Sequence, residues 1–170
     1  MNLPPASAHP LESDDELLAL INATLEAFRS RQRYNVIRAI EGTENLRGRR
    51  IVHADDDLFV MEQLTEALLT ATRGTSSFVL HNKEEPALFA GNIIAHAPEV
   101  VLMDYQLRGF VGPQVVEEIA RLGPNVKCVG FSARQVHNKE FTHVIGTVVK
   151  NTTAPYESLQ ELSHLLRKQA

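Results

Sequence analysis

This chain has only one cysteine, and it lacks long apolar runs and the pattern of a signal sequence. The single cysteine, Cys128, excludes an internal disulfide framework, and its position in an apolar run predicts a buried, inert thiol. No stretch stays apolar over the length needed to span a bilayer. The first residues lack the basic and apolar regions of a signal peptide. We therefore expect a cytoplasmic protein that makes no contact with a membrane.

The chain also lacks a strong excess of either charge. Its 17 basic and 21 acidic residues give a formal net charge of -4 and a pI near 6.0, which argues against a general nucleic-acid binder. Basic residues do gather between Arg29 and Arg50, but no recognition motif accompanies them, so a solvated face is preferred to DNA contact. The histidines show none of the close paired spacing of a zinc site. Hydrophobic residues make up 44% of the chain, enough for the core of one domain with an extension.

The most informative stretch that is present is an apolar run that ends in a carboxylate. Val100 to Met103 is predicted to be a strand buried on both faces, as in parallel sheets covered by helices. Asp104 follows at once, and a loop with Gly109 and Gly112 comes next. Open α/β sheets place their ligand sites at the carboxyl ends of strands. Asp104 is therefore a candidate reactive group, although an aspartate in this place also commonly ends a strand or caps the next helix.

Polar residues follow three further apolar runs in the same way. They are Asp55, Asp56 and Asp57 after residues 51–54, Ser132 after 126–131, and Lys150 after 146–149. In a parallel sheet these groups converge on one edge. The carboxylates would then lie close together and repel one another, and a hard cation would relieve this repulsion. Carboxylates together with phosphate oxygens and water are suitable ligands for Mg²⁺. Lys150 and Ser132 supply a positive charge and a hydroxyl group to a phosphoryl group, and a carboxylate can be its covalent acceptor.

Four short motifs occur in a fixed order: ADDD at 54–57, VLMDYQLRGFVG at 101–112, VGFSA at 129–133 and VVK at 148–150. With these motifs, residues 50–170 resemble the receiver domain of two-component response regulators. The resemblance implies that Asp104 accepts a phosphoryl group from a sensor histidine kinase or a histidine phosphotransfer protein. It also implies that Asp56, Asp104 and the backbone carbonyl of Gln106 bind Mg²⁺, with Asp55 acting largely through water. Ser132 and Lys150 would contact the phosphoryl group.

Strand and helix patterns alternate from residue 50 to residue 170, which predicts a parallel sheet covered by helices. Strands are expected at 51–54, 77–81, 100–103, 126–131 and 146–149, and helices at 58–73, 86–96, 112–122 and 156–168. This is the pattern of the α/β class with a flavodoxin-like, doubly wound, five-stranded sheet in the order 2-1-3-4-5.

Two segments precede this domain. Residues 1–12 hold three prolines and are expected to be disordered. Residues 13–49 are expected to form a helical arm and a linker: Ser13 begins a capping box, and apolar residues recur at helical spacing as far as Ile40. The linker is residues 41–49. Two arrangements of the arm are open: two arms pair and form a homodimer, or the arm folds back on its own domain. We prefer the homodimer.

The sequence departs from the receiver pattern mainly between Ser132 and Lys150. This interval is about one helical turn short, and its polar character predicts that the fourth helix is short or missing. Thr147 occupies the place of an aromatic residue that swings inward as the hydroxyl residue moves. Asn151 stands where a proline usually follows the lysine, and Arg108 replaces another proline.

The leading hypothesis is a stand-alone response regulator or phosphorelay receiver, not an enzyme, which signals through protein contacts. Gln106 and Arg134, two residues after Asp104 and Ser132, are placed to modulate the lifetime of the phosphoryl group. The alternative is a non-switching interaction or dimerisation module with the same fold, which Thr147 and the short interval favour. A Mg²⁺-dependent phosphatase ranks last, because Gln106 stands where its second carboxylate should be.

Overall fold

The computed structural model describes residues 22–23, 26, 41–123, 125–133 and 140–169. The chain divides into two compact units, residues 1–34 and 35–170. Within the predicted arm, Asn22, Ala23 and Glu26 are helical and exposed. The predicted disordered start and the rest of the arm lie outside the described residues, so the domain boundaries and the pairing of arms stay predictions.

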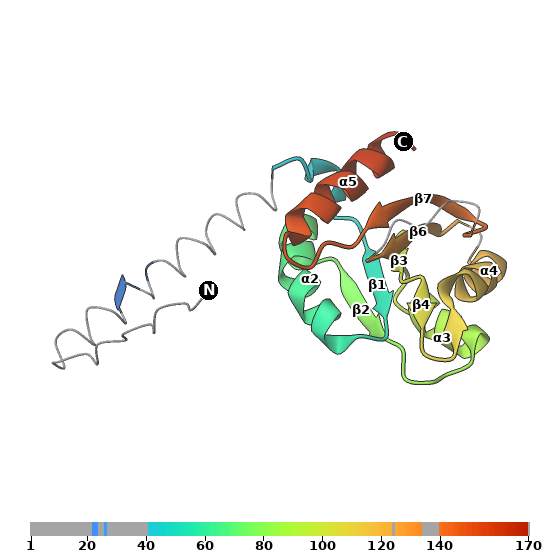
Figure 1. Ribbon diagram of the computed structural model, residues 1–170. Coiled ribbons are helices and arrows are strands. Elements are labelled where there is room, and N and C mark those ends of the chain that lie inside the picture. The colour runs from blue at the N-terminus through green and yellow to red at the C-terminus, as the bar shows by residue number, and fades with distance from the viewer. Residues whose placement is uncertain (1–21, 24–25, 27–40, 124, 134–139, 170) are drawn as a thin grey trace, which may run out of the picture. The chain divides into compact units, whose positions relative to one another are not determined.

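A parallel five-stranded sheet forms the centre of the second unit (Figure 1). Its strands are β1 (Ile51–Asp55), β2 (Ser77–Leu80), β3 (Val100–Met103), β6 (Lys127–Ser132) and β7 (Val144–Val149). They lie in the order β2-β1-β3-β6-β7, and each neighbouring pair is parallel. Counted along the chain within this sheet, the order is the predicted 2-1-3-4-5. The predicted fold class is thus confirmed.

In the described part of the chain, four helices cover the two faces of the sheet in pairs (Figure 1). They are α2 (Leu58–Thr72), α3 (Pro86–Ile94), α4 (Gly112–Leu122) and α5 (Pro155–Arg167). One core cluster joins α2 and α5 to Val100 and Leu102 of β3, and the other joins α3 and α4 to Val101 and Met103. Because side chains alternate along a strand, the central strand β3 is apolar at every position and buried on both faces.

Two small elements were not predicted. A 3-10 helix, η1 (Glu44–Leu46), lies within the predicted linker, and Leu46 is fully buried in the core beside α2 and α5. A single apolar residue in a polar stretch has no periodicity to reveal it. A ribbon of β4 (Gln106–Leu107) and β5 (Phe110–Val111) follows the central strand, and its turn uses Gly109 at a φ of 97°. The loop after Asp104 therefore has a defined shape.

The interval between β6 and β7 is described in part. Residues 134–139 lie outside the described residues, so the short or missing fourth helix is tested only at the margins of the interval. Phe141, near its end, is buried in the core with α3 and α4 and packs edge-on against Tyr105, with ring centroids 5.6 Å apart. In the described part of the chain, no helix has the length and apolar character to cross a membrane.

Candidate functional site

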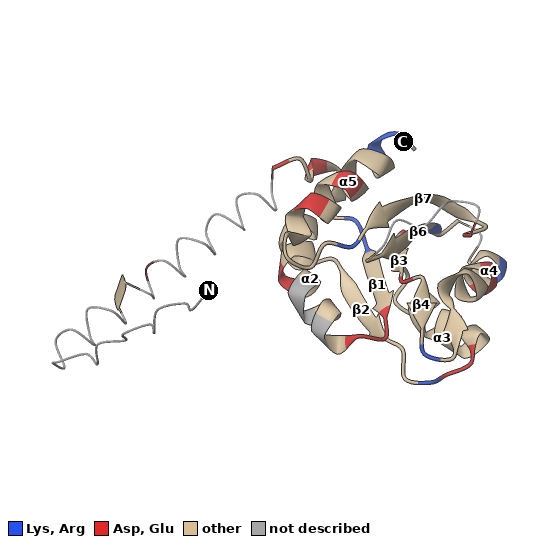
Figure 2. Ribbon diagram, in the orientation of Figure 1, with Lys and Arg blue, Asp and Glu red and all other residues tan. Residues whose placement is uncertain are grey.

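The polar residues singled out in the sequence meet at the carboxyl edge of the sheet. Asp55 and Ser132 are the last residues of β1 and β6, and Asp104 and Lys150 come directly after β3 and β7. The parallel ladder continues past the strand ends: the Asp104 N–H donates to the Ala54 carbonyl (3.0 Å) and the Lys150 N–H to that of Ser132 (2.7 Å). Figure 2 shows acidic residues at the end of β1 and beside β3. Sheet pairing therefore brings together residues far apart in the sequence.

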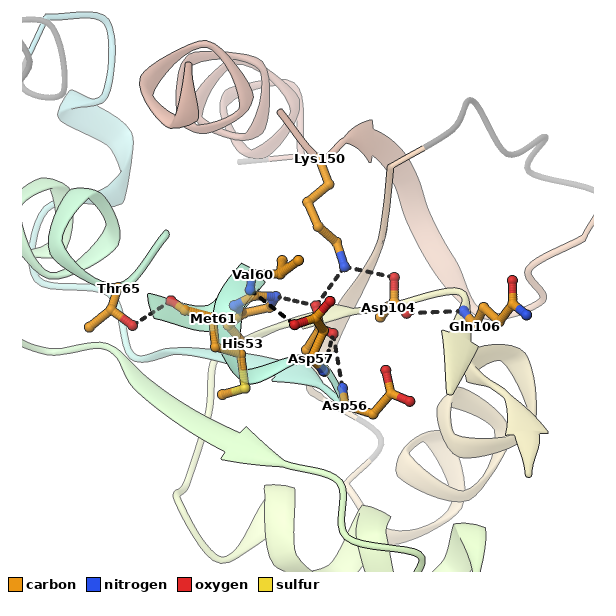
Figure 3. A network of polar contacts seen from close by, with 10 residues as sticks. His53, Asp56, Asp57, Val60, Met61, Thr65, Asp104, Gln106 and Lys150 are labelled. Atoms are coloured by element: carbon orange, nitrogen blue, oxygen red, sulfur yellow. Dashed lines mark hydrogen bonds and ion pairs between the residues drawn. The ribbon is translucent and has the colours of Figure 1, made fainter. Parts of the chain in front are cut away.

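Lys150 joins two of the carboxylates. Its Nζ donates to Asp55 Oδ2 (2.5 Å) and to Asp104 Oδ1 (2.8 Å), as Figure 3 shows. All three residues are buried, and a buried charge is tolerated only when it is paired. Burial alone would lower the pKa of the Lys150 ammonium, but the two carboxylates outweigh it and raise that pKa. Lys150 is therefore a fixed positive charge at the edge of the sheet.

Asp55 makes polar contacts through both of its carboxylate oxygens. Its Oδ1 accepts the backbone N–H groups of Asp56 (2.9 Å) and Asp57 (3.0 Å), and its Oδ2 contacts Lys150 and lies 3.2 Å from His53 Nε2 (Figure 3). Burial would raise the pKa of this carboxyl, but His53 and Lys150 outweigh it and lower the pKa to about 2. Asp55 is therefore an ionised, structurally fixed anion.

His53 is a member of the site that sequence reasoning missed. It is fully buried, on the same face of β1 as Asp55, and its ring packs edge-on against Phe78 and Phe131. His53 falls within the strand predicted at 51–54, and no role in the site was predicted for it. The available signal was its spacing of two residues from Asp55, which puts both side chains on one face of a strand.

Asp104 is held at both of its carboxylate oxygens. Lys150 binds Oδ1, and the Gln106 backbone N–H donates to Oδ2 (3.2 Å). Burial raises the pKa of the Asp104 carboxyl, and the nearby Lys150 offsets this only in part. Gly112 packs directly behind it: a Cβ at this position would lie 1.9 Å from the Asp104 carbonyl oxygen. The loop that presents Asp104 therefore requires a glycine there.

The acidic cluster (Asp55, Asp56 and Asp104) has the donor set of a metal site. Each residue offers one carboxylate oxygen, and these oxygens all lie within 4.8 Å of one another. Oxygen donors of this kind, with space for water, suit Mg²⁺. The Asp56 side chain is 15% exposed and contacts Arg108, whose Nε is 3.5 Å from Asp56 Oδ2. Asp57 points elsewhere: its Oδ1 accepts the Val60 N–H (3.3 Å) at the start of α2.

The strands β6 and β7 contribute Ser132, Thr147 and Lys150. Ser132 is buried at the end of β6, next to the other site residues in the ladder. Thr147 pairs with Gly130, and its methyl group lies close enough that a Cβ on Gly130 would come within 2.9 Å of it. A small β-branched side chain thus fills the position where an aromatic residue was noted as missing. Arg134 lies outside the described residues, so its predicted modulating role stays a prediction.

Asn151 shapes the turn that follows Lys150. Its Oδ1 accepts the backbone N–H groups of Thr153 (3.1 Å) and Ala154 (3.0 Å), just before α5 begins. Ser158 Oγ accepts the Asn151 N–H (2.8 Å) and donates to the Val149 carbonyl (2.7 Å). Asparagine side chains form such turns by mimicking a backbone carbonyl. In this chain a hydrogen-bonded turn stands where a proline was expected, and it holds the backbone next to Lys150.

Comparison with known proteins gives the fold of the chain. No family model and no curated protein matches the sequence. Similar solved structures include a LuxR-family two-component response regulator from an Aurantimonas species (22% identity, TM-score 0.56, covering 71% of this chain and 86% of that one). Another is the receiver domain of a histidine kinase from Arabidopsis thaliana (17% identity, TM-score 0.54, covering 75% of this chain and 93% of that one). A third is the response regulator TrrA from Thermotoga maritima, in complex with Mg²⁺ and beryllium fluoride (19% identity, TM-score 0.51, covering 72% of this chain and 99% of that one).

These likenesses show that the chain has the fold of receiver domains, which confirms the resemblance seen in the sequence at the level of fold. The roles of the individual site residues stay predictions.

Proposed function

We propose that the chain is a response-regulator receiver that accepts a phosphoryl group on Asp104. The observation that carries the proposal is the placement of Asp104. It ends the central strand of a receiver fold, pairs with the buried cation Lys150 and lies in a cluster of three carboxylates. Phosphoryl transfer needs positioning and neutralisation of charge more than covalent chemistry from the protein. This edge of the sheet supplies both.

The proposed step is a displacement at phosphorus. A carboxylate oxygen of Asp104 attacks the phosphorus of a phosphohistidine, the P–N bond breaks, and the imidazole leaves and takes a proton from solvent. The product is an acyl phosphate on Asp104. Lys150 already contacts Asp104 Oδ1 (2.8 Å) and offsets the added negative charge. The Ser132 hydroxyl, buried at the end of the neighbouring strand β6, is the donor we assign to the phosphoryl oxygens.

The acidic cluster fits Mg²⁺, with Asp56, Asp104 and the backbone carbonyl of Gln106 as the ligands. When bound, the ion would neutralise charge on the carboxylates and on the phosphoryl oxygens. Asp55 acts through water in this proposal, because its oxygens already accept two backbone N–H groups and contact two side chains. Its role is to orient Lys150 and to keep the edge of the sheet negative.

The proposed partners follow from the phosphohistidine. They are a sensor histidine kinase or a histidine phosphotransfer protein, in the cytoplasm, and the signal passes on through protein contacts. The homodimer through the N-terminal helix belongs to the same proposal. An added phosphoryl group changes the local charge and can bias a two-state loop.

The second candidate is a receiver fold that does not switch and acts as an interaction module. Two observations favour it. Each carboxylate of the cluster already contacts a cation of the protein, either Lys150 or Arg108. Thr147, which is packed against Gly130 in the sheet, replaces the aromatic residue expected to move.

Intact mass separates the two candidates. The chain is incubated with Mg²⁺ and a small phosphodonor, and we expect a gain of one phosphoryl group in the wild type and in Asp57→Asn but none in Asp104→Asn. Asp57 is the matched control, because it is a neighbouring aspartate whose side chain belongs to the start of α2. A wild-type chain that gains no mass with this donor or with a cognate kinase would favour the interaction module.

A further inference from the structure

The three carboxylates of the acidic cluster contact two different cations. Lys150 contacts Asp55 and Asp104, and its own side chain is 4% exposed. Asp56 instead contacts Arg108, at 3.5 Å, through a guanidinium whose side chain is 71% exposed. The first set of contacts is buried and fixed, whereas the second lies at the rim and can open to solvent.

The ribbon that follows the central strand determines the position of Arg108. Gln106 pairs with Val111 and Leu107 with Phe110, so Arg108 lies in the turn between β4 and β5. Leu107 is 4% exposed and anchors the ribbon in the core with α3 and α4. The ribbon therefore holds the Arg108 backbone beside the acidic cluster, while most of its long side chain is exposed to solvent.

Arg108 also lines a hollow of about 490 Å³, which Asp56 does not line. The hollow is lined by Lys83, Glu84, Glu85, Pro86, Arg108, Gly109, Phe110 and Gln114. Two of these residues, Glu84 and Glu85, are acidic. A guanidinium that leaves Asp56 thus borders a hollow whose lining includes two carboxylates, one of which, Glu84, also accepts the Asn82 N–H.

Asp56 is the carboxylate for which a metal ion and Arg108 must compete. Asp55 already accepts two backbone N–H groups and contacts the buried Lys150, and Asp104 also contacts Lys150, whereas Asp56 contacts the exposed Arg108. Arginine stays charged at every accessible pH, so the competition of Arg108 with a metal ion for Asp56 does not depend on the protonation of Arg108. An exposed ion pair is weak and is easily exchanged.

We propose that Arg108 is a built-in competitor of the metal ion for Asp56. Metal binding displaces the guanidinium toward Glu84 and Glu85 in the hollow, and the chain binds Mg²⁺ more weakly than its three carboxylates alone would. The inference rests on the proposed Mg²⁺ site. It goes beyond that site by assigning a role to the turn of the β4–β5 ribbon.

Titration calorimetry of the full, unphosphorylated chain with Mg²⁺ tests the proposal. Arg108→Ala is expected to tighten Mg²⁺ binding about two- to fivefold, the range that corresponds to loss of one exposed ion pair. Arg108→Lys keeps the charge and is expected to stay near the wild-type affinity. Lys83→Ala removes a positive charge from the same hollow and is expected to have the smaller effect, because Lys83 does not contact Asp56.

Equal or weaker Mg²⁺ binding by Arg108→Ala would overturn the inference while leaving the proposed metal site intact. An equal gain from Lys83→Ala would also overturn it, because the effect would then be general charge and not competition for Asp56. Binding by neither the wild type nor Arg108→Ala would overturn the metal site and the inference together. Binding by Arg108→Ala alone would support the inference in its strongest form.

Discussion

The two halves of the site are held in different ways. The carboxylates at the ends of β1 and β3 receive backbone N–H groups from Asp56, Asp57 and Gln106, whose positions follow from the local chain. The half formed by β6 and β7 is positioned by sheet pairing and by the Asn151 turn. Of the departures from the receiver pattern noted in the sequence, Thr147 and the short interval belong to the β6–β7 half, and Arg108 follows β3. Departures therefore occur beside both halves, and the halves differ mainly in how their polar groups are held.

Lys150 is the link between the halves, and its removal should have the largest effect. Lys150→Met leaves two buried carboxylates without their shared cation, and we expect a loss of about 3–5 kcal/mol in the free energy of unfolding. Arg121→Met is the control: it breaks an exposed pair with Glu118 and should cost at most about 1 kcal/mol. Urea unfolding measures both. Equal losses in the two variants would mean that the halves are not coupled through Lys150.

The two carboxylates bound to Lys150 should respond oppositely to loss of charge. The folded pKa of Asp55, about 2, lies below its ordinary 3.8, so its contribution is present above that ordinary value and is lost as the pH falls through about 2. The pKa of Asp104 is raised, so its contribution is present below its ordinary value and is lost as the pH rises through the folded pKa.

At neutral pH we therefore expect Asp55→Asn to lower the free energy of unfolding by about 2 kcal/mol, and Asp104→Asn to leave it unchanged or raised. Urea unfolding at neutral pH and near pH 3 gives both differences, and the deficit of Asp55→Asn should shrink at the lower pH. A similar loss in the two variants at neutral pH would contradict the assignment.

Glycines behind the two halves test how rigidly each is built. A Cβ at Gly112 meets the backbone of Asp104 at 1.9 Å, whereas one at Gly130 meets the side chains of Phe141 and Thr147, at 2.7 Å and 2.9 Å. Side chains yield more easily than backbone, so we expect losses of about 3 kcal/mol for Gly112→Ala and about 1 kcal/mol for Gly130→Ala.

Gly91, in α3, has nothing within 4 Å of a built Cβ. Gly91→Ala should therefore stabilise the chain by up to about 1 kcal/mol, which makes it the control for helix propensity. Thermal unfolding ranks the three variants. The reverse order for Gly112 and Gly130 would show that the β6–β7 half is the more rigid.

Gln106→Ala should have the smallest effect on stability and should change only the lifetime of the phosphorylated form. The Gln106 side chain is exposed, and the contact of this residue with Asp104 is through its backbone N–H. We expect unchanged unfolding and an altered decay of the phosphorylated form, followed by intact mass, with Gln169→Ala as the control. Decay identical to the wild type would remove the modulating role from Gln106.

Much of the site was predictable because its residues are tied to local patterns. Asp55, Asp104 and Lys150 each come at the end of an apolar run, and parallel strands place such ends on one edge. His53 and Arg108 were not predicted as parts of the site. Neither has a local signature, since a histidine in a strand and an arginine in a turn are common and become informative only beside their partners.

The sequence by itself determined the order of strands and helices, the burial of the central strand and the edge at which the polar residues gather. These follow from hydrophobic periodicity and from the polar residue after each run. The tertiary structure alone decided that Leu46 joins the core, that Arg108 reaches Asp56, and that the pKa of Asp55 falls while that of Asp104 rises. The physical reason is that pairing and burial depend on neighbours brought together by the fold, and Lys150 contacts an Asp55 that lies 95 positions away in the sequence.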